Sequence, residues 1–179
     1  MANYYYFVPS LPSIRPDGGS YMTVDDFLAL CRSHIGKGDY RTLVEVVKGD
    51  GLVKGNAFIE GYSRFRTMVE KELVWQRSRR LGKDRSEYHN DTPPTGAISA
   101  AVRKAVEDED PLRAEKSLLD LHFDYLDRNV GPEHRWDLTA LISYALKLQL
   151  LSRRDSFTVE KGKGEFTRLS EALRGEIFN

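Results

Sequence analysis

Cysteine is almost missing from this sequence, because Cys31 is the single one among 179 residues. One thiol cannot form a disulfide within the chain, and it cannot supply the several thiolates of a structural metal cluster. Cys31 also lies among apolar residues at helical spacing, where a thiol is more often an inert core group than a nucleophile. The sequence therefore predicts neither a disulfide framework nor cysteine-based catalysis.

Long apolar runs and an excess of charge of one sign are also missing. No apolar stretch approaches the roughly 20 residues of a membrane-spanning helix. The opening residues lack the basic start of a secretory signal, and Pro9 interrupts their apolar run. The 27 basic residues balance 27 acidic ones, so no overall field favours nucleic acid or an anionic membrane. We therefore expect a cytoplasmic protein without direct membrane insertion.

Known catalytic and metal-binding signatures are missing as well. The four histidines lack the paired spacing of a helical zinc site; they are His34, His89, His122 and His134. Asp120 and Asp124 share one helical face, but His122 falls on the opposite side, so one ion does not readily reach all three. The glycine-containing segments lack the P-loop spacing, and no G-x-S-x-G nucleophile elbow occurs. We expect a non-enzymatic protein with no cofactor and no metal ion.

Helical periodicity, in contrast, covers most of the chain. Apolar residues recur every three or four positions, and good capping residues begin several stretches, namely Thr23, Asp39, Asp110 and Asp137. The stretches cover about residues 23–35, 39–47, 56–80, 98–105, 111–130, 137–151 and 157–178. We predict an all-α single domain over residues 1–179, a helical bundle of six or seven helices. A short extended segment is expected at the N-terminus, and a hinge or flexible loop at residues 82–95.

The stretch 137–151 is apolar around much of its circumference, which predicts a central helix. Lys147 lies within it, between Leu146 and Leu148. A cation on such a helix needs a charged partner or a route to water. Lys147 is therefore a candidate partner-binding residue.

A cluster of cations ends the 56–80 stretch and continues beyond it. Between Gln76 and Arg85, one acidic residue accompanies five basic ones, namely Arg77, Arg79, Arg80, Lys83 and Arg85. With Trp75 beside them, these cations suit contact with nucleic acid or an acidic protein. Alternatively, they complement the negative end of the helix, and the acidic run 107–110 is available to pair with them. The second interpretation is favoured, because the rest of the chain has no matching basic face.

The chain opens with a row of bulky side chains, Tyr4 to Val8, before Pro9 and Pro12 interrupt it. A chain end that frays would leave these rings in water. We expect the segment to lie in a groove between helices, held there by burial of its rings.

The order and spacing of several short motifs resemble a known family. YYYFVPSLPSI followed by SYMTVDDFLALCRSHI resembles the opening of an uncharacterised bacterial family, a domain of unknown function encoded among V-type ATPase subunits. The stretch from LLDLHFDYLDRNV to KGKGEFTRL is similar to the C-terminal half of that family and to the C/d subunit of archaeal and vacuolar ATPases. The matching positions are Tyr4, Tyr5, Tyr6, Leu11, Pro12, Phe27, Leu28, Cys31, Tyr144, Lys147, Leu148, Gly162 and Phe166.

The resemblance implies a non-catalytic helical subunit or assembly partner of a bacterial V-type ATPase. In the C/d subunit, a funnel of helices sits on the membrane rotor ring and receives the central axle. The expected partners are therefore the central stalk and the rotor ring, and the expected location is the cytoplasm, peripheral to the inner membrane through that complex. Replacement of the longer C/d subunit and a role in assembly both stay open. The alternative is a nucleic-acid or acidic-protein binding module that uses residues 77–85, with nucleic acid the less favoured partner.

Overall fold

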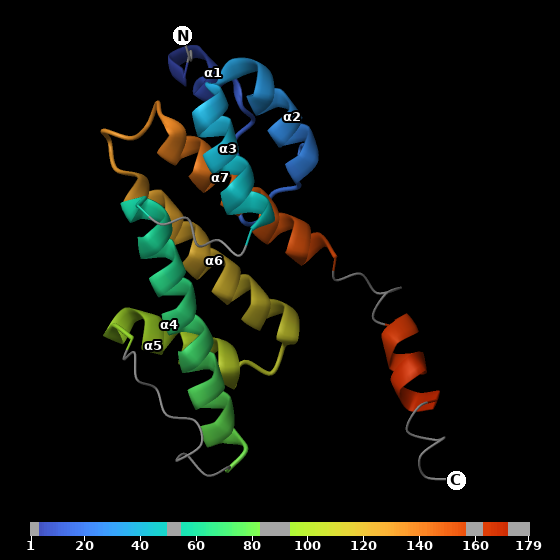
Figure 1. Cartoon of the computed structure of the whole chain (residues 1–179). Helices are drawn as coiled ribbons and strands as arrows, with labels where there is room; N and C mark the ends of the chain where they lie inside the picture. The colour runs from blue at the N-terminus through green and yellow to red at the C-terminus, as the bar shows by residue number, and fades with distance from the viewer. Residues whose placement is uncertain (1–3, 50–54, 83–93, 157–162, 172–179) are drawn as a thin grey trace.

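Every regular element of the described chain is an α-helix (Figure 1). The computed structural model describes residues 4–49, 55–82, 94–156 and 163–171. Its helices are α1 (Tyr4–Ser10), α2 (Val24–His34), α3 (Lys37–Lys48), α4 (Ala57–Arg80), α5 (Gly96–Glu107), α6 (Pro111–Val130) and α7 (Leu138–Asp155). A further helical segment, residues 163–171, has mostly exposed side chains. The all-α prediction is confirmed, and these ranges contain eight helices where six or seven were expected.

Capping side chains begin three helices at the predicted residues. Thr23 and Asp26 form a reciprocal capping box at α2, in which Thr23 Oγ1 accepts the Asp26 amide at 3.1 Å. The Asp110 carboxylate accepts a backbone amide at the start of α6 (2.9 Å), and the Asp137 carboxylate accepts one at the start of α7 (2.7 Å). Each cap satisfies an amide that has no partner within its helix, a contribution of about 1 kcal/mol.

The start of α3 differs from the prediction. Its N-cap is Gly36, which supplies no side-chain hydrogen bond, and Asp39 lies within its first turn. The Asp39 carboxylate instead accepts the phenol proton of Tyr4, with 2.6 Å between the two oxygens. This contact spans 35 residues of sequence. A long-range partner has therefore replaced the local capping role that the sequence pattern indicated.

Helix α7 is the central helix of the bundle, as the sequence predicted. It packs against α1, α2 and α3 on one side and against α6 on another (Figure 1). Its buried apolar side chains are Leu141, Ile142, Ala145, Leu146, Leu148 and Leu151. Burying a side chain of this size contributes about 1.5–3 kcal/mol, so α7 supplies a large part of the core stability.

Helices α4, α5 and α6 form the other part of the bundle, and they extend away from α1–α3 in Figure 1. A buried polar contact joins two of them. Glu72 of α4 is only 4% exposed, and its carboxylate accepts hydrogen bonds from Gln76 and from Ser99 of α5, both at 2.7 Å. These hydrogen bonds offset the cost of removing the carboxylate from water.

The opening aromatic segment is helical rather than extended. Phe7 is buried and stacks on the ring of His34, with 4.4 Å between ring centroids. Tyr5 and Tyr6 are 65% and 71% exposed, so the expected burial of the whole row is wrong for these two rings. The reason is the helical period, because successive side chains turn by about 100° and one face cannot bury five in a row. Pro9 lies in the last turn, where it removes few backbone hydrogen bonds.

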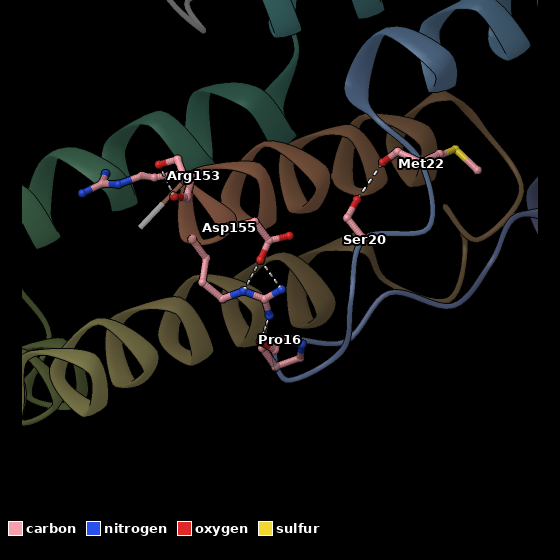
Figure 2. A network of polar contacts seen from close by, with 7 residues as sticks. Pro16, Ser20, Met22, Arg153 and Asp155 are labelled. Atoms are coloured by element: carbon pink, nitrogen blue, oxygen red, sulfur yellow. Dashed lines mark hydrogen bonds and ion pairs between the residues drawn. The ribbon is translucent and has the colours of Figure 1, made fainter. Parts of the chain in front are cut away.

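The segment between α1 and α2 runs along α7 and is fixed to it by two side chains. The Tyr144 hydroxyl donates to the Pro12 carbonyl at 2.9 Å. Arg154 Nη1 donates to the Pro16 carbonyl at 2.7 Å, while its Nε and Nη2 hold the Asp155 carboxylate at 2.8 and 2.6 Å (Figure 2). The chain start is therefore attached to the last long helix by polar contacts as well as by packing.

One continuous set of buried apolar side chains draws on all of α1 to α7. The hinge predicted at residues 82–95 falls mainly on residues 83–93, which lie outside the described residues. None of the described helices is both long enough and apolar enough to cross a membrane.

The central position of α7 predicts unequal costs for two identical substitutions. Leu141→Ala removes a fully buried side chain and should lower the free energy of unfolding by about 2–5 kcal/mol. Leu112→Ala removes the same atoms from a side chain that is 72% exposed, and should change it by less than about 0.5 kcal/mol. Urea unfolding followed by circular dichroism measures both. Similar losses would contradict the arrangement.

Candidate functional site

The basic residues at the end of α4 do not act as one group. Arg77, Arg79 and Arg80 are all exposed in its last turn. The Arg80 guanidinium donates to the Val106 carbonyl of α5, so this cation joins two helices. Lys83 and Arg85 lie outside the described residues. Trp75 is half-buried. Because Arg80 contacts α5, the described cations of this predicted site that remain for a partner are Arg77 and Arg79.

The acidic run 107–110 pairs mainly with a different helix. Arg113 of α6 contacts the carboxylates of Asp108 and Asp110, at 3.2 and 3.4 Å. Within the described chain, neither Arg77 nor Arg79 forms an ion pair with this run. The sequence suggested that this run pairs with the cations at the end of α4, but among the described residues it pairs with Arg113 instead. The described contact of those cations with α5 is that of Arg80 with the Val106 carbonyl.

A groove of about 380 Å³ lies between α4, α6 and α7. In its wall, the Tyr62 hydroxyl is hydrogen-bonded to Nδ1 of His122 at 3.1 Å. Burial lowers the pKa of His122 to about 4, and the nearby cations Arg153 and Arg66 act in the same direction. Burial also raises the pKa of Tyr62 to about 12. Both groups are therefore neutral near pH 7.

His122 lines the groove whereas Asp124 is exposed, which agrees with their expected places on opposite sides of the helix. Within the described ranges, no three His, Cys, Asp or Glu side chains are placed to share a metal ion. Cys31 is fully buried, and burial raises its thiol pKa to about 12, so it remains a thiol in the core at neutral pH. The prediction that Cys31 is an inert core residue is consistent with this placement.

Lys147 has a charged partner, one of the two possibilities that the sequence left open. Its ammonium forms an ion pair with Asp127 of α6, and its side chain is only 13% exposed. The ammonium also lies 5.6 Å from the centre of the Phe123 ring, within range of a cation–π contact. Lys147 lines a second pocket of about 420 Å³, located between the end of α6, the following turn and α7.

Three exposed rings form what we call the aromatic surface, namely Tyr5, Tyr6 and Trp136. Tyr5 contacts the other two, with ring centroids 5.3 Å from Tyr6 and 5.9 Å from Trp136. Trp136 is 45% exposed and lies in the turn between α6 and α7. The sequence analysis missed Trp136, because a single ring in a polar turn belongs to no periodic pattern. An exposed tryptophan between two helices is nevertheless a usable signal of an interaction site.

Most residues that carry the family resemblance are structural. Phe27, Leu28, Cys31 and Leu148 are buried, and Tyr144 holds the Pro12 carbonyl. Tyr5 and Tyr6 are exposed, and so is Phe166 in the segment 163–171. Gly162 lies outside the described residues. Comparisons of this chain with known protein families, with curated proteins and with solved structures found no match.

The neutral state of His122 predicts acid-dependent stability. An unfolded histidine binds a proton near pH 6.5, whereas native His122 does so only near pH 4. The unfolded state therefore binds more protons between these values, and stability should fall as the pH is lowered from about 6.5 towards 4, by at most about 3 kcal/mol.

Urea unfolding of the wild type and of His122→Gln at pH 7 and pH 5 measures this effect. The variant should lose less stability than the wild type over that interval. His134→Gln serves as the control, because His134 is exposed beside Asp137 and its pKa is raised rather than lowered. An equal loss in the wild type and His122→Gln would show that the pKa of native His122 is not lowered relative to that of an unfolded histidine.

Proposed function

We propose that this chain is a non-catalytic subunit or assembly partner of a bacterial V-type ATPase, one that links the central rotor axle to the membrane ring. The observation that carries the proposal is the aromatic surface. Tyr5 and Tyr6 belong to the YYYF motif on which the family resemblance begins, yet they cover little of the core. Their exposure calls for a role outside the core.

The composition of the aromatic surface favours binding to another protein. Tyrosine and tryptophan are enriched among the residues that dominate binding energies at protein interfaces. Contact between the rings of Tyr5 and Trp136 also places two separate parts of the chain in one patch. Rings held in this way lose little conformational freedom when a partner covers them.

A linking role needs two separate surfaces, and the bundle offers two. Two residues of the aromatic surface belong to α1, whereas Arg77 and Arg79 lie in the last turn of α4. Helix α1 and the end of α4 lie at opposite ends of the bundle in Figure 1. Between them, α4 is a helix of 24 residues packed on α5 and α6. A packed bundle of this kind suits the transmission of force between a rotor axle and a ring without any chemical step.

Co-purification tests the proposal. A tagged chain isolated from native membranes in mild detergent should retain V-type ATPase subunits, and the double variant Tyr5→Ser, Tyr6→Ser should retain at least about tenfold less, as expected when interface rings are removed. Tyr21→Ser is the matched control, because Tyr21 is also 71% exposed but makes no ring contact in the described chain. Recovery of no ATPase subunit with the wild type would refute the ATPase role.

The alternative is a module that binds nucleic acid or an acidic protein through the end of α4. The exposed guanidinium groups of Arg77 and Arg79, which form no ion pair within the described ranges, support it. Binding that depends on these cations should weaken steeply with salt, and removing one cation that binds a phosphate should reduce the salt slope by about 1.

Fluorescence anisotropy with labelled single-stranded RNA at about 50 and about 200 mM salt tests the nucleic-acid form of this alternative. The double variant Arg77→Glu, Arg79→Glu should abolish binding. Arg41→Glu, an exposed arginine on α3, is the control and should leave binding nearly unchanged. If the double variant binds as well as the control, the end of α4 is not the contact surface.

A further inference from the structure

The pocket beside Lys147 is distinct from the groove that contains His122. Ala140, Ser143, Tyr144 and Lys147 line it from α7, while the His122 groove is lined from α7 by Leu146, Gln149 and Leu150, among others. The two hollows therefore use different faces of one helix. The remaining walls of the Lys147 pocket come from the end of α6 and the turn after it, including Asp127, Gly131 and Arg135.

Ser143 gives this pocket an unsatisfied hydrogen-bonding group. The residue is 3% exposed, and its Oγ is the one buried side-chain polar atom in the described chain with no hydrogen-bond partner. Leaving such a hydroxyl unpaired costs free energy, so native proteins rarely keep one without a reason. Ser143 lies one helical turn before Lys147 on the same face of α7, and both line the pocket.

The Lys147 ammonium has N–H donors that its ion pair does not use. It carries three N–H groups, and Asp127 is its single ion-pair partner in the described ranges. That carboxylate is 64% exposed, so it is largely solvated and only partly offsets the desolvation of the buried ammonium. A second oxygen atom bound in the pocket would accept a hydrogen bond from the remaining N–H groups of Lys147.

The charges around the pocket favour an anion. Three basic residues and one acidic residue line it, namely Arg128, Arg135, Lys147 and Asp127. Arg128 forms a long ion pair with Asp124, at 3.5 Å, and both of these side chains are well exposed. Arg135 forms no ion pair in the described chain. The lining therefore carries a net positive charge, and an exposed guanidinium stands at its edge.

We propose that this pocket is a carboxylate-binding site, in which Ser143, Lys147 and Arg135 donate to one carboxylate group. A carboxylate suits the lining better than a doubly charged phosphate, because Asp127 on the wall repels the second negative charge. The carboxylate comes either from a free small molecule or from an acidic side chain of a protein seated on the neighbouring Trp136. The site does not depend on the proposed ATPase role.

Binding is tested by nuclear magnetic resonance titration of the full chain at constant ionic strength. Two probes are used, sodium acetate and an end-blocked glutamate hexapeptide, with sodium chloride and an end-blocked glutamine hexapeptide as their controls. Amide signals of Ser143, Lys147 and Gly131 should shift saturably with at least one probe. If acetate alone binds, the source is a free carboxylate; if the glutamate peptide binds at least about tenfold tighter than acetate, the source is an acidic protein segment.

Two variants identify the donors. Ser143→Ala and Arg135→Gln should each weaken binding of the active probe about tenfold, as expected for loss of one hydrogen bond to a charged group. Ser152→Ala, in an exposed position of the same helix, and Arg41→Gln are the matched controls and should bind like the wild type. The proposal is overturned if neither probe shifts these signals saturably, or if both donor variants bind like their controls.

A second readout, the thermal unfolding midpoint without added carboxylate, tests the unpaired hydroxyl itself. Ser143→Ala should raise this midpoint more than Ser152→Ala does, because it removes a buried group that has no partner in the free protein. The comparison with Ser152→Ala corrects for the higher helix propensity of alanine. A lower midpoint for Ser143→Ala would show that the hydroxyl already has a partner within the fold, and would refute its assignment to a ligand.

Discussion

The structure depends on the burial of α7 on most of its sides. Burying a helix in this way costs free energy unless most of the polar side chains along it find partners. Four of them do so by reaching other segments: Tyr144 to Pro12, Gln149 to Val47, Lys147 to Asp127 and Arg154 to Pro16. These contacts join α7 to the chain start, to α3 and to α6. The polar side chains of α7 therefore fix the positions of the same elements that pack against its apolar side chains.

The elements that the sequence predicted well are those set by local patterns. Thr23, Asp110 and Asp137 were identified as helix starts because a cap and its amide are separated by only two or three residues. The central place of α7 followed from its apolar circumference. Asp39 was assigned wrongly because its partner, Tyr4, is 35 residues away. Burial of the whole row Tyr4 to Val8 was expected because its composition is apolar and aromatic. The helical period, however, determines which of these side chains face the core.

The candidate sites could be predicted only in part for the same reason. The sequence indicated that Lys147 needs a charged partner or a route to water, but the choice between them depends on how α6 packs on α7. Nothing local indicates that the Ser143 hydroxyl lacks a hydrogen bond, since an ordinary helical serine can use the backbone of the preceding turn. The arginines of α4 were recognised as a cluster, yet their separation into a helix–helix contact and exposed cations required the position of Val106.

The turn between α6 and α7 carries Arg135 and Trp136 side by side, and it begins at Gly131, whose φ of 68° is readily adopted only by glycine. The direction in which the chain leaves α6 thus depends on a backbone torsion that other residues adopt only with strain. Both side chains follow Gly131 in the chain, so a rotation there would move Arg135 at the pocket and Trp136 of the aromatic surface together. A backbone change at Gly131 that improves the position of one of these side chains therefore moves the other as well.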